Sequence, residues 1–137
     1  MKESFFQKPD IKQVLSDKDL SQFGDCVVNF IYNVAICRAT QKLQGVKVWD
    51  YSLAKACKNS PLRSYVGSRK NAGELGDAVE AFIGYLYIKR KSELEYFIDV
   101  LTRYIEHDWD KKKISPKELC AAAFTHLLNK IWEDVNF

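Results

Sequence analysis

Two segments of the sequence carry carboxylates in nearly the same pattern. Residues 23–31 read FGDCVVNFI and residues 75–83 read LGDAVEAFI, which share the pattern G-D-x-V-x-x-F-I. In each segment an aspartate, Asp25 or Asp77, follows a glycine within a stretch that is apolar on nearly every side. Helices of this kind lie in the middle of a bundle, where an unpaired charge is costly. A proton, a basic partner or a cation must therefore balance these charges.

The second segment adds a third carboxylate. Asp77 and Glu80 are three residues apart, so on a helix they stand side by side and repel each other unless something positive lies between them. Magnesium binds carboxylate oxygens together with several waters. We therefore predict that Asp25, Asp77 and Glu80 converge from two helices as the metal ligands and catalytic residues of an open Mg²⁺ site, in which Mn²⁺ could substitute.

A helix cap is the alternative interpretation of Asp77 and Glu80. An aspartate followed three residues later by a glutamate is a helix-start pattern, and the glycine before it suits a turn. Two observations count against the cap. The helical pattern already begins at Ala72, and a cap gives no reason for two helices to share the same carboxylate pattern. The metal site is the favoured interpretation.

The elements that must position these residues are helical throughout. Apolar residues recur at helical spacing, and no segment alternates as a strand would. Capping patterns at Ser92–Glu95 and Ser115–Glu118 mark two late helix starts. The 137 residues, 47% of them hydrophobic, suit one all-α domain spanning residues 1–137. The expected helices cover residues 20–44, 49–58, a short stretch ending near 67, 72–91, and two more after 92 and 115.

Composition excludes several classes of function. No stretch approaches the roughly 20 apolar residues that cross a bilayer, and none near the start reads as a signal core, so we expect a cytoplasmic protein without membrane contact. The four cysteines show no CxxC spacing, and both histidines are isolated, which argues against a zinc site. Residues 38–70 hold eight basic residues against one acid, Asp50. This block indicates either a polyanion-binding face or an ordinary solvated surface.

The carboxylate segments resemble ribonuclease III. Residues 23–25 match the end of the family's first motif, and residues 77–87, DAVEAFIGYLY, match its second. Residues 53–67 resemble the short helices that precede that second motif, so the likeness covers about residues 16–91. It implies a ribonuclease III-like endonuclease bundle with two extra C-terminal helices in residues 92–137. It also implies magnesium-dependent cleavage of double-stranded RNA by a homodimer whose chain has no separate RNA-binding domain.

One departure from the family pattern affects the metal site. Longer members carry two glutamates before Gly24-Asp25, where this sequence has Lys18 and Ser21. Compact bacterial Mini-ribonuclease III also lacks a glutamate before its Gly-Asp, so the substitution does not by itself imply an inactive protein. The number of metal ions per site stays open.

Residues just before the second motif are predicted to contact the RNA backbone. They are Arg63, Arg69, Lys70 and Asn71, and an ordinary surface location is the alternative for each. A non-catalytic RNA-binding or ribosome-associated domain, with a decayed active site on the same fold, is the alternative function. A plain helical interaction module is a third.

Overall fold

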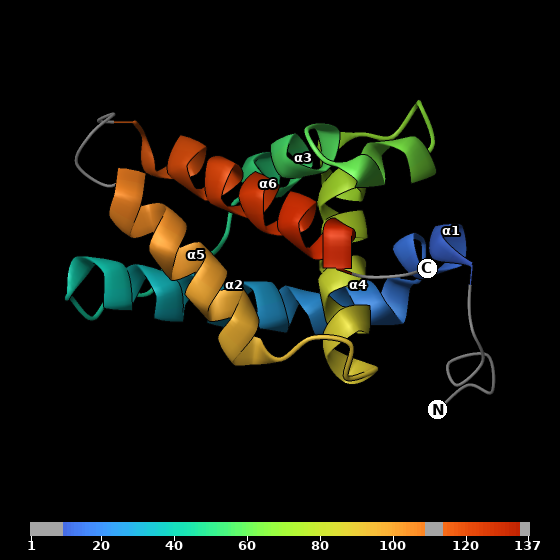
Figure 1. The fold of residues 1–137 in the computed structure, drawn as a ribbon. Coiled ribbons are helices and arrows are strands. Elements are labelled where there is room, and N and C mark those ends of the chain that lie inside the picture. The colour runs from blue at the N-terminus through green and yellow to red at the C-terminus, as the bar shows by residue number, and fades with distance from the viewer. Residues whose placement is uncertain (1–9, 109–113, 135–137) are drawn as a thin grey trace.

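The computed structural model describes residues 10–108 and 114–134, and within these ranges it contains six α-helices, one short 3-10 helix and no strand (Figure 1). This confirms the all-α prediction. The elements are α1 (Ile11–Leu15), α2 (Lys18–Thr40), α3 (Asp50–Lys58), η2 (Pro61–Tyr65), α4 (Ala72–Ile88), α5 (Leu94–Asp108) and α6 (Pro116–Asp134).

The α2 helix ends earlier than the sequence predicted. Its start is capped by Asp17, whose carboxylate accepts hydrogen bonds from two backbone amides of the first turn. At the other end Gln41 adopts a left-handed conformation, with φ of 59°. The chain then turns back as an irregular segment, residues 41–49, along α2. The expected continuation to residue 44 was wrong because side chains of α2 bind the backbone of this returning segment.

The two C-terminal helices begin close to their predicted starts. At α6 the Ser115 hydroxyl accepts a hydrogen bond from the Glu118 amide at 3.3 Å, as its capping pattern indicated. At α5 the first helical residue is Leu94, and the Glu95 carboxylate accepts two hydrogen bonds from the guanidinium of Arg38, at 3.0 and 3.2 Å. Glu95 therefore joins α5 to α2, a role that the capping pattern did not indicate.

The most extensive helix contact joins α2 to α4, which cross in Figure 1. A Cβ atom on Gly24 would lie 1.7 Å from the carbonyl oxygen of Glu80, which is far inside van der Waals contact. A Cβ on Gly84 would lie 3.0 Å from the Cα of Gly24 and 3.1 Å from the carbonyl oxygen of Leu20. The two backbones thus touch at this crossing, and only glycine fits at position 24.

The other helices close a core around this pair. The α5 helix packs on α2, and α6 packs on α3 and α5. Buried aromatic rings fill the centre, and the ring of Tyr32 stacks on that of Phe124 with centroids 5.7 Å apart. The buried hydroxyl of Ser52 in α3 donates to the carbonyl of Lys117 in α6 at 2.8 Å, and Glu118 pairs with Lys55. No helix among residues 10–108 and 114–134 is long and apolar enough to cross a membrane.

Substitution of Gly24 by alanine tests the crossing. The added methyl group must push α4 away, so we expect Gly24→Ala to lower the free energy of unfolding by about 3 kcal/mol or more. Chemical denaturation monitored by circular dichroism measures this. Gly73→Ala is the matched control, because its Cβ would meet only the Asn71 side chain, at 3.4 Å, and alanine favours the helix. Equal stability of the two variants would contradict the crossing.

Candidate metal-binding active site

The start of α4 shows that Asp77 and Glu80 do not cap a helix. The cap is Asn71, whose side chain accepts a hydrogen bond from the Glu74 amide at 2.9 Å. The Glu74 carboxylate in turn accepts from the Asn71 amide at 3.2 Å. Asp77 and Glu80 therefore lie one and two turns inside the helix, and the helix-cap interpretation is excluded.

The three predicted carboxylates differ in burial. Glu80 is 7% exposed, whereas the Asp25 side chain is 45% exposed and Asp77 lies at the surface. The expectation that both aspartates occupy buried positions was wrong. Glu80 is the buried acid because its backbone touches Gly24 at the helix crossing, while Asp77 lies one turn earlier on α4, outside the crossing.

The crossing brings the carboxyl groups of Asp25 and Glu80 into a hydrogen bond. The pKa of Glu80 is raised to about 9, mainly by burial and then by the contact with Asp25 and the charges of Asp25, Asp77 and Asp50. The same hydrogen bond is the main reason that the pKa of Asp25 is lowered. At neutral pH Glu80 thus keeps a proton and donates it to the Asp25 carboxylate.

Asp50 is a fourth acid near this pair that sequence reasoning missed. It is the first residue of α3, and its charge contributes to the raised pKa of Glu80. Its backbone carbonyl lies 3.7 Å from where a Cβ of Gly76 would be, which places the start of α3 beside α4. The one available signal was that Asp50 is the sole acid within the basic block.

These four acids have the donor chemistry that magnesium prefers, because all of their ligand atoms are carboxylate oxygens. Within the described part of the chain, no three Asp, Glu, His or Cys side chains already stand in a metal-binding arrangement. Asp25 and Glu80 do meet, and a cation that took the place of the proton between them would find carboxylate oxygens of both residues. The residues therefore fit a divalent cation that replaces this proton.

The sequence of these helices was compared with models of known protein families. The family model of ribonuclease III matches residues 18–137 of this sequence. The chain belongs to the ribonuclease III family. The match extends past residue 91, so the region that the model describes includes the two C-terminal helices as well as the carboxylate segments. No curated protein matches the sequence.

The residues predicted to contact RNA differ in their surroundings in this ribonuclease III fold. The Arg63 guanidinium donates to the carbonyls of Val66 and Gly67 and so stabilises its own loop. Asn71 caps α4. Arg69 is exposed, and the Lys70 ammonium lies 3.3 Å from the Glu74 carboxylate. The loop thus presents Arg69 and Lys70 to solvent and uses the other two residues for its own structure.

The basic block proposed from the sequence is partly neutralised by ion pairs. Arg38 pairs with Glu95, Lys55 with Glu118, Lys47 with Asp25 and Lys70 with Glu74. Half of the eight cations thus face a carboxylate within residues 10–108 and 114–134. The local charge balance of residues 38–70 therefore overstates the positive charge that a polyanion would meet.

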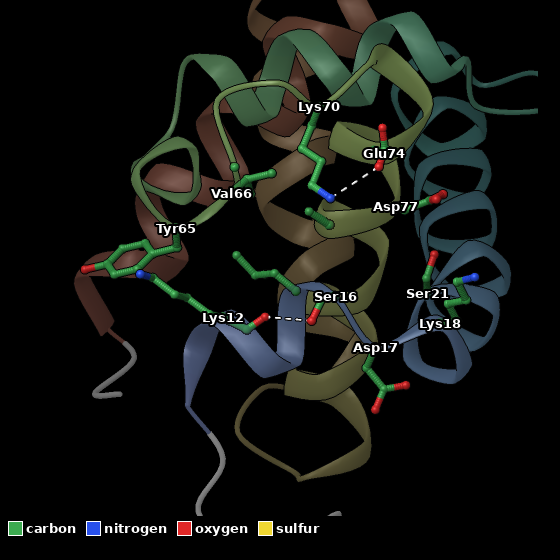
Figure 2. Close-up of a pocket in the computed structure, with 13 residues that line it drawn as sticks. Lys12, Ser16, Asp17, Lys18, Ser21, Tyr65, Val66, Lys70, Glu74 and Asp77 are labelled. Atoms are coloured by element: carbon green, nitrogen blue, oxygen red, sulfur yellow. Dashed lines mark hydrogen bonds and ion pairs between the residues drawn. The ribbon is translucent and has the colours of Figure 1, made fainter.

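A pocket of about 230 Å³ opens beside Asp77 (Figure 2). Figure 2 shows Lys12 of α1 next to Tyr65 on one side of it and Ser21 of α2 on the other, with Lys70 above. Ser21, the position at which the sequence comparison expects a glutamate in longer ribonuclease III members, lines this pocket together with acidic and basic side chains.

The proton on Glu80 makes the stability of the metal-free protein depend on pH. The folded protein holds this proton up to about pH 9, whereas the unfolded chain loses it at the ordinary, lower pKa of glutamate. Stability therefore falls as pH rises between these values, because the unfolded state binds fewer protons. We expect Glu80→Gln to remove this fall. The melting temperature of the variant minus that of the parent should therefore increase as the pH rises from about 5 to 9.

Thermal melts in a chelator at several pH values measure the difference. The exposed Glu106→Gln on α5 is the control and should follow the parent curve. A constant offset between Glu80→Gln and the parent across this range would show that Glu80 is ionised in the folded protein.

Proposed function

We propose that this member of the ribonuclease III family is a metal-dependent endoribonuclease that hydrolyses phosphodiester bonds in double-stranded RNA. The observation that carries the proposal is the buried Glu80, held against Asp25 by a glycine crossing, with the charges of Asp77 and Asp50 close by. A fold gains nothing in stability from burying Glu80 among three other acids. Such a cluster is instead typical of a functional cation site.

Asp25, Asp77 and Glu80 would hold the magnesium ion, and Glu80 would release its proton as the ion binds. Bound magnesium would supply activation of a water molecule and neutralisation of charge on the phosphate. In the reaction the water oxygen forms a bond to phosphorus, the opposite P–O bond breaks, and the leaving oxygen takes up a proton. The carboxylates fix the reacting groups in line, which removes an entropic cost.

Exposed cations before α4 would place the RNA on this site. Arg69 and Lys70 are the two exposed cations of the predicted set, and both precede the helix that carries Asp77 and Glu80. Contacts to phosphates and 2′-hydroxyls recognise the shape of an A-form duplex and carry little sequence information. Weak sequence preference is therefore part of the proposal.

A homodimer is the proposed assembly, with one site for each strand. An apolar stripe on α2 supports it, since Phe23 is 36% exposed and Phe30, seven residues on and thus on the same face, is 54% exposed. The Phe23 ring stacks on Tyr87 of α4 with centroids 6.3 Å apart, which extends the stripe onto the second site-bearing helix. A twofold axis through such a patch buries the same residues of both subunits.

Non-catalytic binding of structured RNA is the second candidate function. Ser21 favours it, because the position lacks the carboxylate that longer members use for metal. The two candidates differ in whether a bound duplex RNA is shortened when magnesium is added.

Substitution of a metal ligand should separate stability from activity. Asp77→Asn removes a ligand and one source of repulsion at Glu80. We expect it to leave the metal-free melting temperature equal or higher, to abolish magnesium-dependent cleavage of duplex RNA, and to reduce the stabilisation by magnesium. Gel analysis of cleavage and thermal melts with and without magnesium provide the measurements.

The exposed Glu106→Gln is again the control for loss of one negative charge and should cleave as the parent does. If the parent binds duplex RNA but never shortens it, the non-catalytic function is correct. If Asp77→Asn cleaves at the parent rate, Asp77 is not a ligand.

Charge reversal tests the RNA-binding loop. The double variant Arg69→Glu, Lys70→Glu should bind duplex RNA more weakly. Its affinity should also decrease less steeply with salt, because a protein that makes fewer phosphate contacts releases fewer counterions on binding. Binding is measured at several salt concentrations in calcium or without metal. Arg103→Glu with Lys130→Glu, exposed on α5 and α6, changes the net charge equally. An identical salt dependence in both double variants would show that the loop makes no specific contact.

A further inference from the structure

Lys47 lies on a segment that α2 holds at two points. The Asn33 side chain accepts a hydrogen bond from the Val46 amide and donates one to the Val46 carbonyl, both at 2.7 Å. The Asn29 side chain accepts from the Val48 amide, also at 2.7 Å. The residues on both sides of Lys47 are therefore fixed, although the segment has no regular secondary structure.

This clamp directs Lys47 to the candidate metal site. Its ammonium nitrogen lies 3.6 Å from a carboxylate oxygen of Asp25, and the Asn29 amide donates to the same oxygen at 3.1 Å. Asp25, Asn29 and Asn33 recur every four residues, so one face of α2 carries both the carboxylate and the clamp. An isolated surface ion pair stabilises a fold only slightly, so stability alone does not account for a lysine that is held at this carboxylate.

The charges of the site leave a role for this lysine. Three acids, Asp25, Asp77 and Asp50, lie around Glu80, and one magnesium ion brings two positive charges. Ser21 provides no carboxylate to hold a second ion. Lys47 is the cation that the described structure places on Asp25, and its side chain is 76% exposed and so accessible to a ligand that reaches Asp25. A lysine is a compact charge on a flexible stem and can exchange one oxygen partner for another.

We propose that Lys47 is a catalytic residue of this site that takes the place of a second metal ion. In the RNA-free protein its ammonium neutralises Asp25. With Asp25 engaged as a ligand of the cation, the Lys47 ammonium would be free to pair with a non-bridging oxygen of the phosphate that is being cleaved and would stabilise the charge that develops there. This inference rests on the proposed nuclease function. Lys47, on the segment between α2 and α3, would supply the positive charge that a metal ion held by the first-motif glutamate would otherwise bring.

Three variants test the proposal: Lys47→Met, Lys47→Arg and, as the matched control, Lys42→Met, an exposed lysine of the same segment. The first measurement is the magnesium concentration that half-saturates thermal stabilisation without RNA. The second is the single-turnover cleavage rate of duplex RNA at saturating magnesium and protein. Lys47→Met should need several-fold less magnesium, because the competing ammonium is gone, yet should cleave at least about tenfold more slowly.

Lys47→Arg should retain the parent's magnesium requirement and most of its rate, and Lys42→Met should match the parent in both measurements. An unchanged magnesium midpoint in Lys47→Met, or a parent-like rate, overturns the proposal. A rate loss shared equally with Lys42→Met also overturns it, because general attraction of RNA would then explain the effect. If the parent cleaves no RNA, the nuclease function itself fails, and the claim that Lys47 acts on a phosphate fails with it.

Discussion

Two helices can approach until their backbones touch only where neither presents a side chain, and α2 and α4 do so at Gly24. This contact fixes the distance between the carboxyl groups of Asp25 and Glu80. It also excludes water from Glu80, which is why that acid holds a proton at neutral pH. The arrangement of the remaining helices follows, since α3 and α5 pack against the sides of this pair. A steric requirement at one residue therefore sets both the shape of the core and the electrostatics of the site.

The acidic cluster is consequently a source of strain in the metal-free protein. The proton on Glu80 avoids repulsion with the neighbouring acids, but the unfolded chain releases this proton at neutral pH and is thereby favoured relative to the folded protein. Proteins tolerate such destabilising groups where they serve a function and where the surrounding core is well packed. Here the buried aromatic core around Tyr32 and Phe124 gives that support.

The sequence was sufficient for features that depend on local pattern. The helices follow from apolar periodicity, and the meeting of Asp25 with Glu80 followed from two matching segments that each had to be buried. Features that depend on how segments pack were not accessible in this way. Asp50 reaches the site only because α3 lies against α4, and the early end of α2 results from Asn33 binding a segment thirteen residues later. The matching segments are also not equivalent, since Gly76 faces α3 whereas Gly24 forms the crossing.

The link between α3 and α6 gives the last helix a part in the site that its distance along the chain conceals. The buried Ser52 hydroxyl is bonded to the first turn of α6, and Glu118 holds both Tyr51 and Lys55. These contacts bracket the start of α3, where Asp50 stands. The α6 helix thus supports the start of α3 and with it Asp50. The carboxylate motifs on α2 and α4 alone therefore do not include all of the charges that act on Glu80. A change in α6 that breaks these contacts therefore also alters the position of Asp50, although α6 itself supplies none of the four acids.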